Sequence, residues 1–359
     1  MTVLTLLVAL VAAGAATDPG QSLKAGKAGL ASAGPLAFGP DGILFVGDSA
    51  GATLWAIDTG DRTPGTGSIN VSGLQDKVAA MLGTTPDQVA INDMIVNPIS
   101  RKAYLSVSRG RGPDAAAVIL RLDATGKIED LRLDNVKHAK VSLANAPAAD
   151  AKDRRGNSLR TESITDVHYV DGKVFLAGLS NEEFASKLRS VPFPFTAADD
   201  GTSVEIYHGA HGAWETRSPV RTFVPYEIKK ESHILAAYTC TPLVKFPVKE
   251  LKPGSKLVGT TIAELGNRNR PLDMIVYKKD GGEFVLMSNS SRGVMKMSTK
   301  GIEGHEAITT PVEDKKGLPY ETVADWKGVE QLDKLDDGNA LVLTRAEGGA
   351  LDLKTLALP

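Results

Sequence analysis

A short apolar strand with an acidic residue near its start recurs along this chain, each time followed by a tight turn and a second apolar strand. Clear copies of the first strand lie at residues 91–96, 164–169 and 271–276. Their return strands lie at residues 103–107, 173–178 and 283–288. A motif that recurs in this way predicts several copies of one supersecondary unit.

Weaker copies extend the series at residues 35–57 and 328–353, and a divergent copy occupies residues 221–248. Six units of about fifty residues each are typical of four-stranded propeller blades. Asp-Gly turns, such as the one at residues 171–172, separate the strands and predict hairpins. We therefore expect an all-β fold, a six-bladed β-propeller of four-stranded antiparallel blades.

Helical periodicity is confined to residues 75–82 and 180–188, and the second segment has a possible capping box between Ser180 and Glu183. A parallel α/β fold would need a helix after most strands, so this class is excluded. The last copy ends after three strands near Leu353, and a strand within residues 22–30 is expected to complete that blade. Residues 17–359 then form one domain, with an exposed insertion at about 144–158.

The first residues predict export. Residues 3–13 form an apolar run that is too short to span a bilayer, and small residues follow at positions 13–16. We expect a signal peptide over residues 1–16 and a periplasmic or secreted mature chain without a membrane span. Because no Lys or Arg precedes the apolar run, an uncleaved anchor or a misassigned start is the alternative.

Composition narrows the range of partners. Cys240 is the only cysteine, so no disulfide can form within the chain. The 41 basic and 43 acidic residues give a formal net charge of -2, and this balance argues against a nucleic-acid surface. The expected partner is a small molecule or another protein.

The recurrent acidic residues are candidate ion ligands. In a propeller the first strand of every blade lines the central channel, so Asp93, Asp166 and Asp273 are expected to converge there, with Glu227 and Glu330 near equivalent positions. Carboxylates that face one channel repel one another unless a cation or protons neutralise them. Oxygen ligands favour Ca²⁺ or another hard divalent ion. Alternatively, each acid accepts backbone hydrogen bonds from a neighbouring blade.

Two residues are candidates for catalysis at this channel. His168 follows Asp166 by two residues, so both side chains lie on one face of the strand and the histidine can carry protons. Glu227 is the second candidate, because in the divergent copy it lies near the position equivalent to the channel aspartates.

His208 and His211 are candidate transition-metal ligands. They are separated by Gly209 and Ala210 and followed by Glu215, a spacing that can chelate Zn²⁺ or Cu²⁺ if a third ligand approaches. A plain glycine-rich turn is the alternative, and this turn is expected at the end of the propeller opposite the mouth. Cys240 is expected near the mouth, where a thiolate would suit copper or redox chemistry; otherwise it is a small buried hydrophobe.

The blade pattern resembles the six-bladed propellers of the NHL, SMP-30/gluconolactonase and calcium-dependent phosphotriesterase type. In these families, acidic and amide residues of inner strands hold a central divalent ion. The resemblance implies that Asp93, Asp166, Glu227 and Asp273 face an ion, that Asn92 supplies an amide, and that the activity is of the lactonase or esterase kind.

Three functions follow from the sequence. The first is a ligand-binding or metal-dependent hydrolytic site at an acid-lined channel. The second is a copper or zinc redox protein that uses His168, His208, His211 and Cys240. The third is a noncatalytic interaction scaffold, because the fold alone does not determine function.

Overall fold

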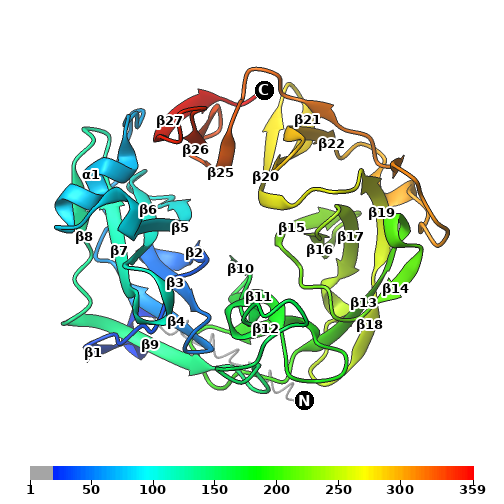
Figure 1. The fold of residues 1–359 in the computed structure, drawn as a ribbon, viewed down its shortest axis with the longest axis horizontal. Coiled ribbons are helices and arrows are strands. Elements are labelled where there is room, and N and C mark those ends of the chain that lie inside the picture. Colours follow the sequence, from blue (N-terminus) through cyan, green and yellow to red (C-terminus); the bar gives the residue numbers. More distant parts are fainter. Residues whose placement is uncertain (1–18) are drawn as a thin grey trace, which may run out of the picture.

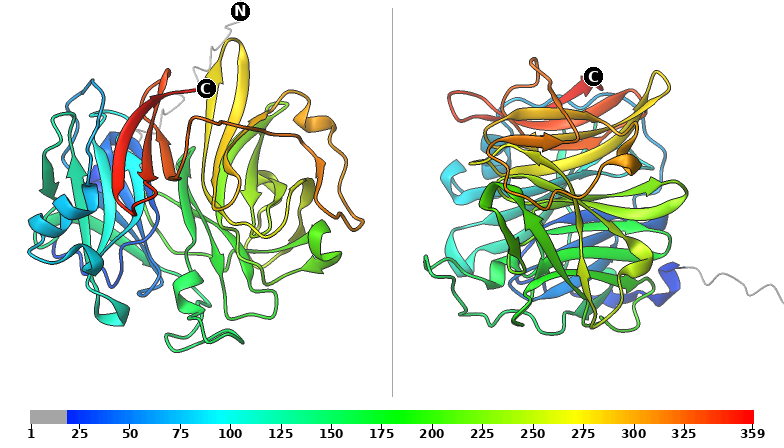
Figure 2. Two further views of the ribbon diagram at one scale, coloured as in Figure 1. Left: turned by 45° about the horizontal axis from the view of Figure 1, so that its top comes forward. Right: turned by 90° about the vertical axis from the view of Figure 1, so that its right-hand side faces the viewer.

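The computed structural model describes residues 19–359, so the expected signal peptide over residues 1–16 lies outside the described part of the chain. Six small sheets stand in a ring around a central opening (Figure 1). Their strands cross from one face of the ring to the other (Figure 2). The predicted all-β, six-bladed propeller is confirmed. Among the described residues, no helix has the length and apolar character needed to cross a membrane.

We number the blades by the chain order of their inner strands and give their strands from the channel outward. Blade 1 consists of β2 (Leu36–Phe38), β3 (Ile43–Asp48), β4 (Thr53–Asp58), β9 (Val136–Ser142) and β1 (Lys24–Gly26). Blade 2 consists of β5 (Val89–Val96), β6 (Ala103–Arg109), β7 (Ala116–Leu122) and β8 (Ile128–Asp130). Blade 3 consists of β10 (Asp166–Val170), β11 (Lys173–Leu179), β12 (Ser186–Pro192), β13 (Thr202–His208) and β14 (Ala213–Glu215), with β18 (Lys256–Val258) parallel to β13.

The other three blades follow the same plan. Blade 4 consists of β15 (Thr222–Ile228), β16 (Glu231–Ala237), β17 (Pro242–Pro247), β19 (Thr260–Leu265) and β23 (Lys315–Gly317). Blade 5 consists of β20 (Pro271–Lys279), β21 (Gly282–Asn289), β22 (Gly293–Ser298) and β24 (Glu321–Thr322). Blade 6 has only β25 (Val329–Lys334), β26 (Asn339–Arg345) and β27 (Leu351–Ala357). The number of strands therefore departs from the expected four in several blades.

One α-helix, α1 (Leu74–Met81), confirms the helical periodicity of residues 75–82. The helix expected at residues 180–188 is absent, because Ser180 Oγ accepts the N–H of Glu182 in a short turn and β12 begins at Ser186. Short 3₁₀ turns connect the strands: η1 (Pro19–Ser22), η2 (Pro40–Gly42), η3 (Pro86–Gln88), η4 (Gly112–Asp114), η5 (Arg160–Glu162), η6 (Gly209–His211), η7 (Val248–Glu250) and η8 (Ile302–Gly304).

The hydrophobic core is divided into six clusters, and each cluster fills the space between two neighbouring blades. Leu54 and Val174, for example, share the cluster between blades 1 and 3, whereas Val46 and Tyr104 share the one between blades 1 and 2. The clusters and the contacts between inner strands give the order of blades around the ring as 2, 1, 3, 4, 5, 6. Chain order and spatial order therefore differ at blades 1 and 2.

This exchange arises because blade 2 is inserted into blade 1. The chain forms β2, β3 and β4, leaves to build all of blade 2, and returns as β9 to pair with β4. The N-terminal strand β1 then pairs antiparallel with β9, from Lys24 opposite His138 to Gly26 opposite Val136. The expectation that residues 22–30 complete the last blade is therefore wrong.

Residues 69–73 take the place of the missing fourth strand in blade 6. Val71 forms an isolated antiparallel bridge with Leu353, and Thr355 Oγ1 both accepts the N–H of Ile69 (2.8 Å) and donates to its carbonyl (3.0 Å). Asp352 Oδ1 accepts the N–H of Gly73 (2.9 Å). Because α1 and β5 follow this segment, blade 2 is joined to blade 6 and the ring closes there.

The valine variant Thr355→Val keeps the shape of the side chain but removes both hydrogen bonds to Ile69. Because Ile69 is fully buried, its polar backbone groups lose partners, and we expect the free energy of unfolding to fall by about 1–3 kcal/mol. Urea unfolding measures this change. The control Thr322→Val, in exposed strand β24, should alter stability by less than about 0.5 kcal/mol. Equal stabilities of the two variants would show that the hydrogen bonds between residues 69–73 and β27 do not contribute measurably to the free energy of unfolding.

Candidate functional site

The channel is lined by the inner strands β2, β5, β10, β15, β20 and β25, and an aspartate on β5 shows how these strands are joined. The N–H of Leu36, in the next blade, donates to Asp93 Oδ2 (2.7 Å). The N–H of Met94 donates to Asp93 Oδ1 (2.8 Å). One carboxylate therefore fixes its own strand and connects it to the neighbouring inner strand.

The same pair of contacts recurs at three more aspartates. Each accepts the N–H of its own following residue and one N–H of the next blade, at 2.7–2.9 Å. The donors in the next blade are Phe223 for Asp166, Leu332 for Asp273 and Val96 for Asp333. We call these four residues the aspartate clamps. All four join blades in the same rotational sense, so the backbone-bonding alternative describes their structural role.

The clamp in blade 6 was not predicted. Leu272 in β20 and Glu330 in β25 are both bulge residues that have no opposite residue on the next strand. When the two strands are aligned at their bulges, the position of Asp273 is occupied by Gln331 in blade 6. Asp333 forms its clamp two residues further along the strand. Glu330, expected near the channel acids, lines the same cavity as Asp93 and Asp273, where it forms an ion pair with Arg345. The Leu-Asp pair at 332–333 matches the one at 272–273 and was the available signal.

Burial raises the pKa of all four clamp carboxyls, because the charged form loses hydration. The pKa of Asp93 is raised to about 8, first by burial and then by Asp166 and Asp333. The pKa of Asp333 is raised to about 6 by burial, and the pKa values of Asp166 and Asp273 are raised by the same cause. For Asp273 the repulsion by Asp93 adds to the effect of burial.

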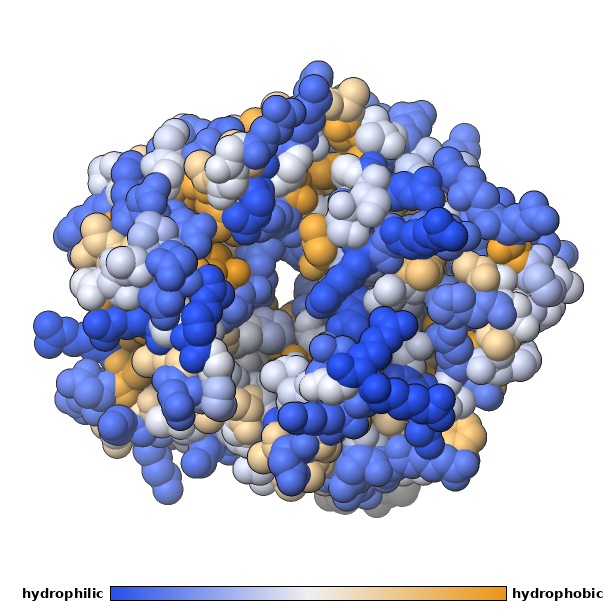
Figure 3. All heavy atoms as spheres, in the orientation of Figure 1, coloured by the Kyte–Doolittle hydropathy of each residue, from blue (hydrophilic) through white to orange (hydrophobic). Residues whose placement is uncertain are grey.

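Two cavities meet at the clamps. The wider cavity has a volume of about 650 Å³ and the narrower one about 220 Å³. Asp93, Asp166 and Asp273 line both, so these three carboxylates form a waist between them. We call the wider cavity the mouth, and an opening at the centre of the ring is visible in Figure 3.

The narrower cavity contains His168, Asp333 and Lys334. His168 Nε2 lies 3.8 Å from Asp166 Oδ2, and the imidazole ring packs edge-on against Phe223. The structure therefore places His168 beside a waist carboxylate, and its role in proton transfer stays a prediction.

The mouth is rimmed by arginines that sequence reasoning did not identify. Arg221, Arg270 and Arg345 line it together with amide and hydroxyl side chains, including Asn92, Thr165, Thr222, Asn289, Ser290 and Gln331. A glutamate holds two of the arginines: Glu162 Oε2 accepts from Arg221 Nη1 (2.5 Å), and Glu330 accepts from Arg345 Nη2 (3.0 Å). The guanidinium of Arg270 makes no hydrogen bond or ion pair with any described residue.

Glu227 does not lie at the mouth as expected, and Cys240 lies on the mouth face without lining either cavity. Glu227 is exposed near the far end of β15 and lines neither cavity, because the strand begins at Thr222, and Thr222 is the residue that reaches the mouth. Cys240 lies in the turn between β16 and β17, where its N–H donates to the carbonyl of Asn269 (2.8 Å). It is therefore on the same face as the mouth, but it is remote from Glu227 along β15 and lines neither cavity.

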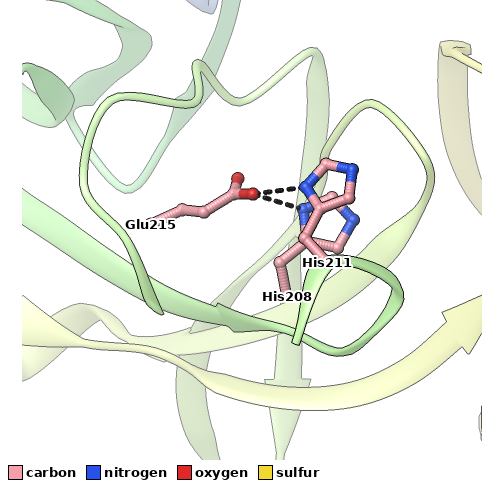
Figure 4. A group of neighbouring side chains, drawn as sticks. All are labelled: His208, His211 and Glu215. Carbon is pink, nitrogen blue, oxygen red and sulfur yellow. Dashed lines mark hydrogen bonds and ion pairs between the residues drawn. The ribbon is translucent and has the colours of Figure 1, made fainter. Parts of the chain in front are cut away.

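His208, His211 and Glu215 form one group at the outer part of blade 3 (Figure 4). Glu215 Oε1 lies 3.0 Å from His208 Nδ1 and 2.6 Å from His211 Nδ1, and the two imidazole rings are 3.8 Å apart. Burial by itself would raise the pKa of Glu215, but hydrogen bonds from His208, Ser218 and His211 outweigh burial and lower this pKa to about 2.

The position of this turn corrects the expectation that it lies opposite the mouth. The carbonyl of Thr216 accepts the N–H of Ser186, and the carbonyl of Glu183 accepts from Arg217 Nε, so residues 216–217 lie beside the loop between β11 and β12. That loop is on the mouth face, because β10 starts there and β11 ends there. The group still lies outside the residues that line the channel.

Only the group of His208, His211 and Glu215 brings three potential metal ligands within 4.8 Å of one another, among the residues that the structure describes. The waist carboxylates do not meet this condition. Asp93, Asp166 and Asp273 thus converge as predicted but are not close enough for one ion to bind all three directly in this geometry.

The raised pKa values predict a pH dependence of stability. Between the unfolded pKa of about 4 and the folded pKa of about 8, folded Asp93 retains a proton that the unfolded chain releases, so the free energy of unfolding falls as pH rises through this window. The variant Asp93→Asn should reduce the slope of the unfolding free energy against pH by up to about 1.4 kcal/mol per pH unit, as measured by urea unfolding. The exposed control Asp337→Asn should keep the wild-type slope. An unchanged slope in Asp93→Asn would contradict the raised pKa.

No protein-family model matches this chain, and no curated protein sequence matches it. Solved structures do. An oxidoreductase named as a glucose dehydrogenase from Thermus thermophilus is 14% identical over 93% of this chain and 100% of that chain, with a TM-score of 0.38. The PQQ-bound aldose sugar dehydrogenase from Streptomyces coelicolor is 12% identical over 93% and 96%, with a TM-score of 0.35.

The extracellular region of plexin A4 is 10% identical over 94% of this chain and 40% of that chain, with a TM-score of 0.39. At these identities and TM-scores the similarities carry no functional information about this chain. The resemblance to NHL and SMP-30 propellers stays a prediction.

Proposed function

We propose that this protein binds a small organic anion in the mouth of the channel. The observation that carries the proposal is Arg270, whose guanidinium lines the mouth without a partner among the described residues. The mouth volume of about 650 Å³ falls within the range of small-molecule sites.

Electrostatics within the rim support an anionic ligand. Burial lowers the pKa of Arg270 and repulsion by Arg221 lowers it further, whereas the nearby Glu162 carboxylate raises it. A bound carboxylate or phosphate would relieve this repulsion and satisfy the free N–H donors of Arg270. Arg221 and Arg345 are held in place by Glu162 and Glu330 and therefore present a rigid rim.

The end of the mouth at the waist favours a neutral or cationic group of the ligand over an anionic one. The waist carboxylates Asp93, Asp166 and Asp273 lie at its inner end, and a second anionic group there would be repelled. A hydroxyl or amine can hydrogen-bond to them. The ligand class that fits both ends is a hydroxy or amino acid, or a comparable small anion with neutral or cationic polar groups.

The other functions expected from the sequence receive less support from the geometry. A metal-dependent hydrolase at the waist would need carboxylate oxygens closer together, and a redox site that combines Cys240 with the histidines would need them in one group. Export of the chain to the periplasm or the medium stays a prediction, because residues 1–16 lie outside the described part.

Calorimetric titration with small hydroxy acids, amino acids and inorganic phosphate tests the proposal, with glucose as a neutral probe. We expect at least one anion to bind and Arg270→Gln to weaken it by about tenfold or more, because a charged hydrogen bond is lost. Arg268→Gln is the matched control, since Arg268 is exposed two residues away and does not line the mouth.

Two results would count against the proposal. If none of the anions binds to the wild type, the scaffold function becomes the better explanation. If both arginine variants weaken binding equally, the ligand is held by general surface charge and not by the mouth.

A further inference from the structure

We propose a second site, independent of the channel: a Zn²⁺ site formed by His208, His211 and Glu215. All three ligands come from one hairpin. His208 ends β13, His211 lies in η6, and Glu215 ends β14. The turn between them needs glycine at position 212, where the backbone has a φ of +61°.

The ligand atoms are already close to a metal-binding arrangement. Tetrahedral zinc with bonds of about 2.0–2.2 Å holds its ligand atoms about 3.3 Å apart. The two nitrogen-to-oxygen distances at Glu215 Oε1 are 3.0 Å and 2.6 Å, so a small outward movement would admit the ion. His211 can make this movement, because half of its side chain is exposed.

The buried side of the group contains two polar atoms that lack partners. His208 is 1% exposed, and its Nε2 makes no hydrogen bond. Glu264 Oε2 is also buried without a partner. Glu264 is adjacent to the turn, since its Oε1 accepts the N–H of Gly209 (2.5 Å) and a Cβ on Gly209 would come within 3.0 Å of its Cγ.

A metal ion would fix the proton on one of these two atoms and so allow them to pair. When His208 binds the ion through Nδ1, its proton must reside on Nε2, which then becomes a donor. Glu264 is the neighbouring carboxylate with a free acceptor atom. A carboxylate that accepts from a metal-bound imidazole is a recurrent feature of zinc sites, because it fixes the ring and increases its basicity.

Ser218 prepares the third ligand. Its hydroxyl donates to Glu215 Oε2, so this oxygen is occupied and Oε1 is left to face the histidines. Glu215 thus has an orienting partner in Ser218. His208 Nε2 and Glu264 Oε2 do not hydrogen-bond to each other in this geometry, and we expect that contact to form only when the ion binds.

The donor set favours Zn²⁺ over Ca²⁺ and Cu⁺. Two imidazoles and one carboxylate suit Zn²⁺, whereas Ca²⁺ prefers oxygen ligands alone. Cys240 does not belong to the group, so the thiolate that favours Cu⁺ is missing among the described ligands. With three protein ligands, the fourth position of the ion is left for water or another small ligand on the exposed side of His211.

The test uses the full chain, freed of metal with a chelator and then titrated with Zn²⁺ by calorimetry. Co²⁺ serves as a spectroscopic probe, because tetrahedral Co²⁺ absorbs strongly in the visible range. We expect one Zn²⁺ per chain and a tetrahedral Co²⁺ spectrum. His211→Ala should weaken zinc binding at least about a hundredfold, and Glu264→Gln about tenfold through its effect on His208.

Two controls separate this site from the rest of the molecule. His305→Ala removes a histidine outside the group and should bind zinc like the wild type. Asp166→Asn changes the waist and should bind zinc like the wild type. The zinc titration therefore tests the zinc site separately from the anion site in the channel. Because His211 is half exposed, its alanine variant should fold, and circular dichroism confirms this.

The proposal is overturned if the metal-free protein takes up no Zn²⁺ or if His211→Ala retains wild-type affinity. It is also overturned if Asp166→Asn abolishes zinc uptake while His211→Ala does not, because the ion then resides in the channel.

Discussion

The clamp carboxylates hold the centre of this ring together. In most of the molecule, neighbouring blades meet through apolar side chains, which fix distance but not register. Near the axis, a carboxylate that accepts one N–H from each of two inner strands fixes their relative height as well. The four clamps therefore set the register at four of the six blade interfaces, from Asp93 to Asp333.

This arrangement has a cost that shapes the functional site. Aspartates brought together at a narrow waist repel one another, and the raised pKa values of Asp93 and Asp273 are the result of burial together with this repulsion. The arginines of the mouth lie on the other side of the same cavity, and two of them are bound to glutamates outside the clamps. The channel is thus polarised along its axis, with positive charge at the rim and carboxyls at the waist. A ligand with an anionic group at one end and a neutral or cationic polar group at the other fits this gradient.

The sequence allowed the fold to be predicted further than the chemistry. The repeated strand pairs around Asp93, Asp166 and Asp273 were sufficient for the blade number and for the convergence of these residues. They could not show whether the carboxylates bind an ion or backbone, because that depends on N–H groups of a neighbouring blade more than fifty residues away.

Glu227 was misplaced because the divergent copy has no aspartate to set its register. Arg270 was overlooked because nothing marks a lone arginine before a strand. The order of blades was also inaccessible, since β9 at residues 136–142 resembles any short strand and its pairing with β4 leaves no local trace.

The insertion of blade 2 within blade 1 has a consequence for biosynthesis. As the chain leaves the ribosome, β1 to β4 emerge before blade 2, and neither β1 nor the outer edge of β4 has its partner until residues 136–142 follow. Blade 1 is therefore finished only after every strand of blade 2 has been made, and the two blades form one cotranslational unit of residues 24–142. The loop that β9 closes spans all of blade 2, and its entropic cost is reduced once blade 2 has folded into a compact body. Nascent chains stalled before residue 136 should thus display an open sheet edge, the kind of surface that chaperones recognise and that promotes aggregation.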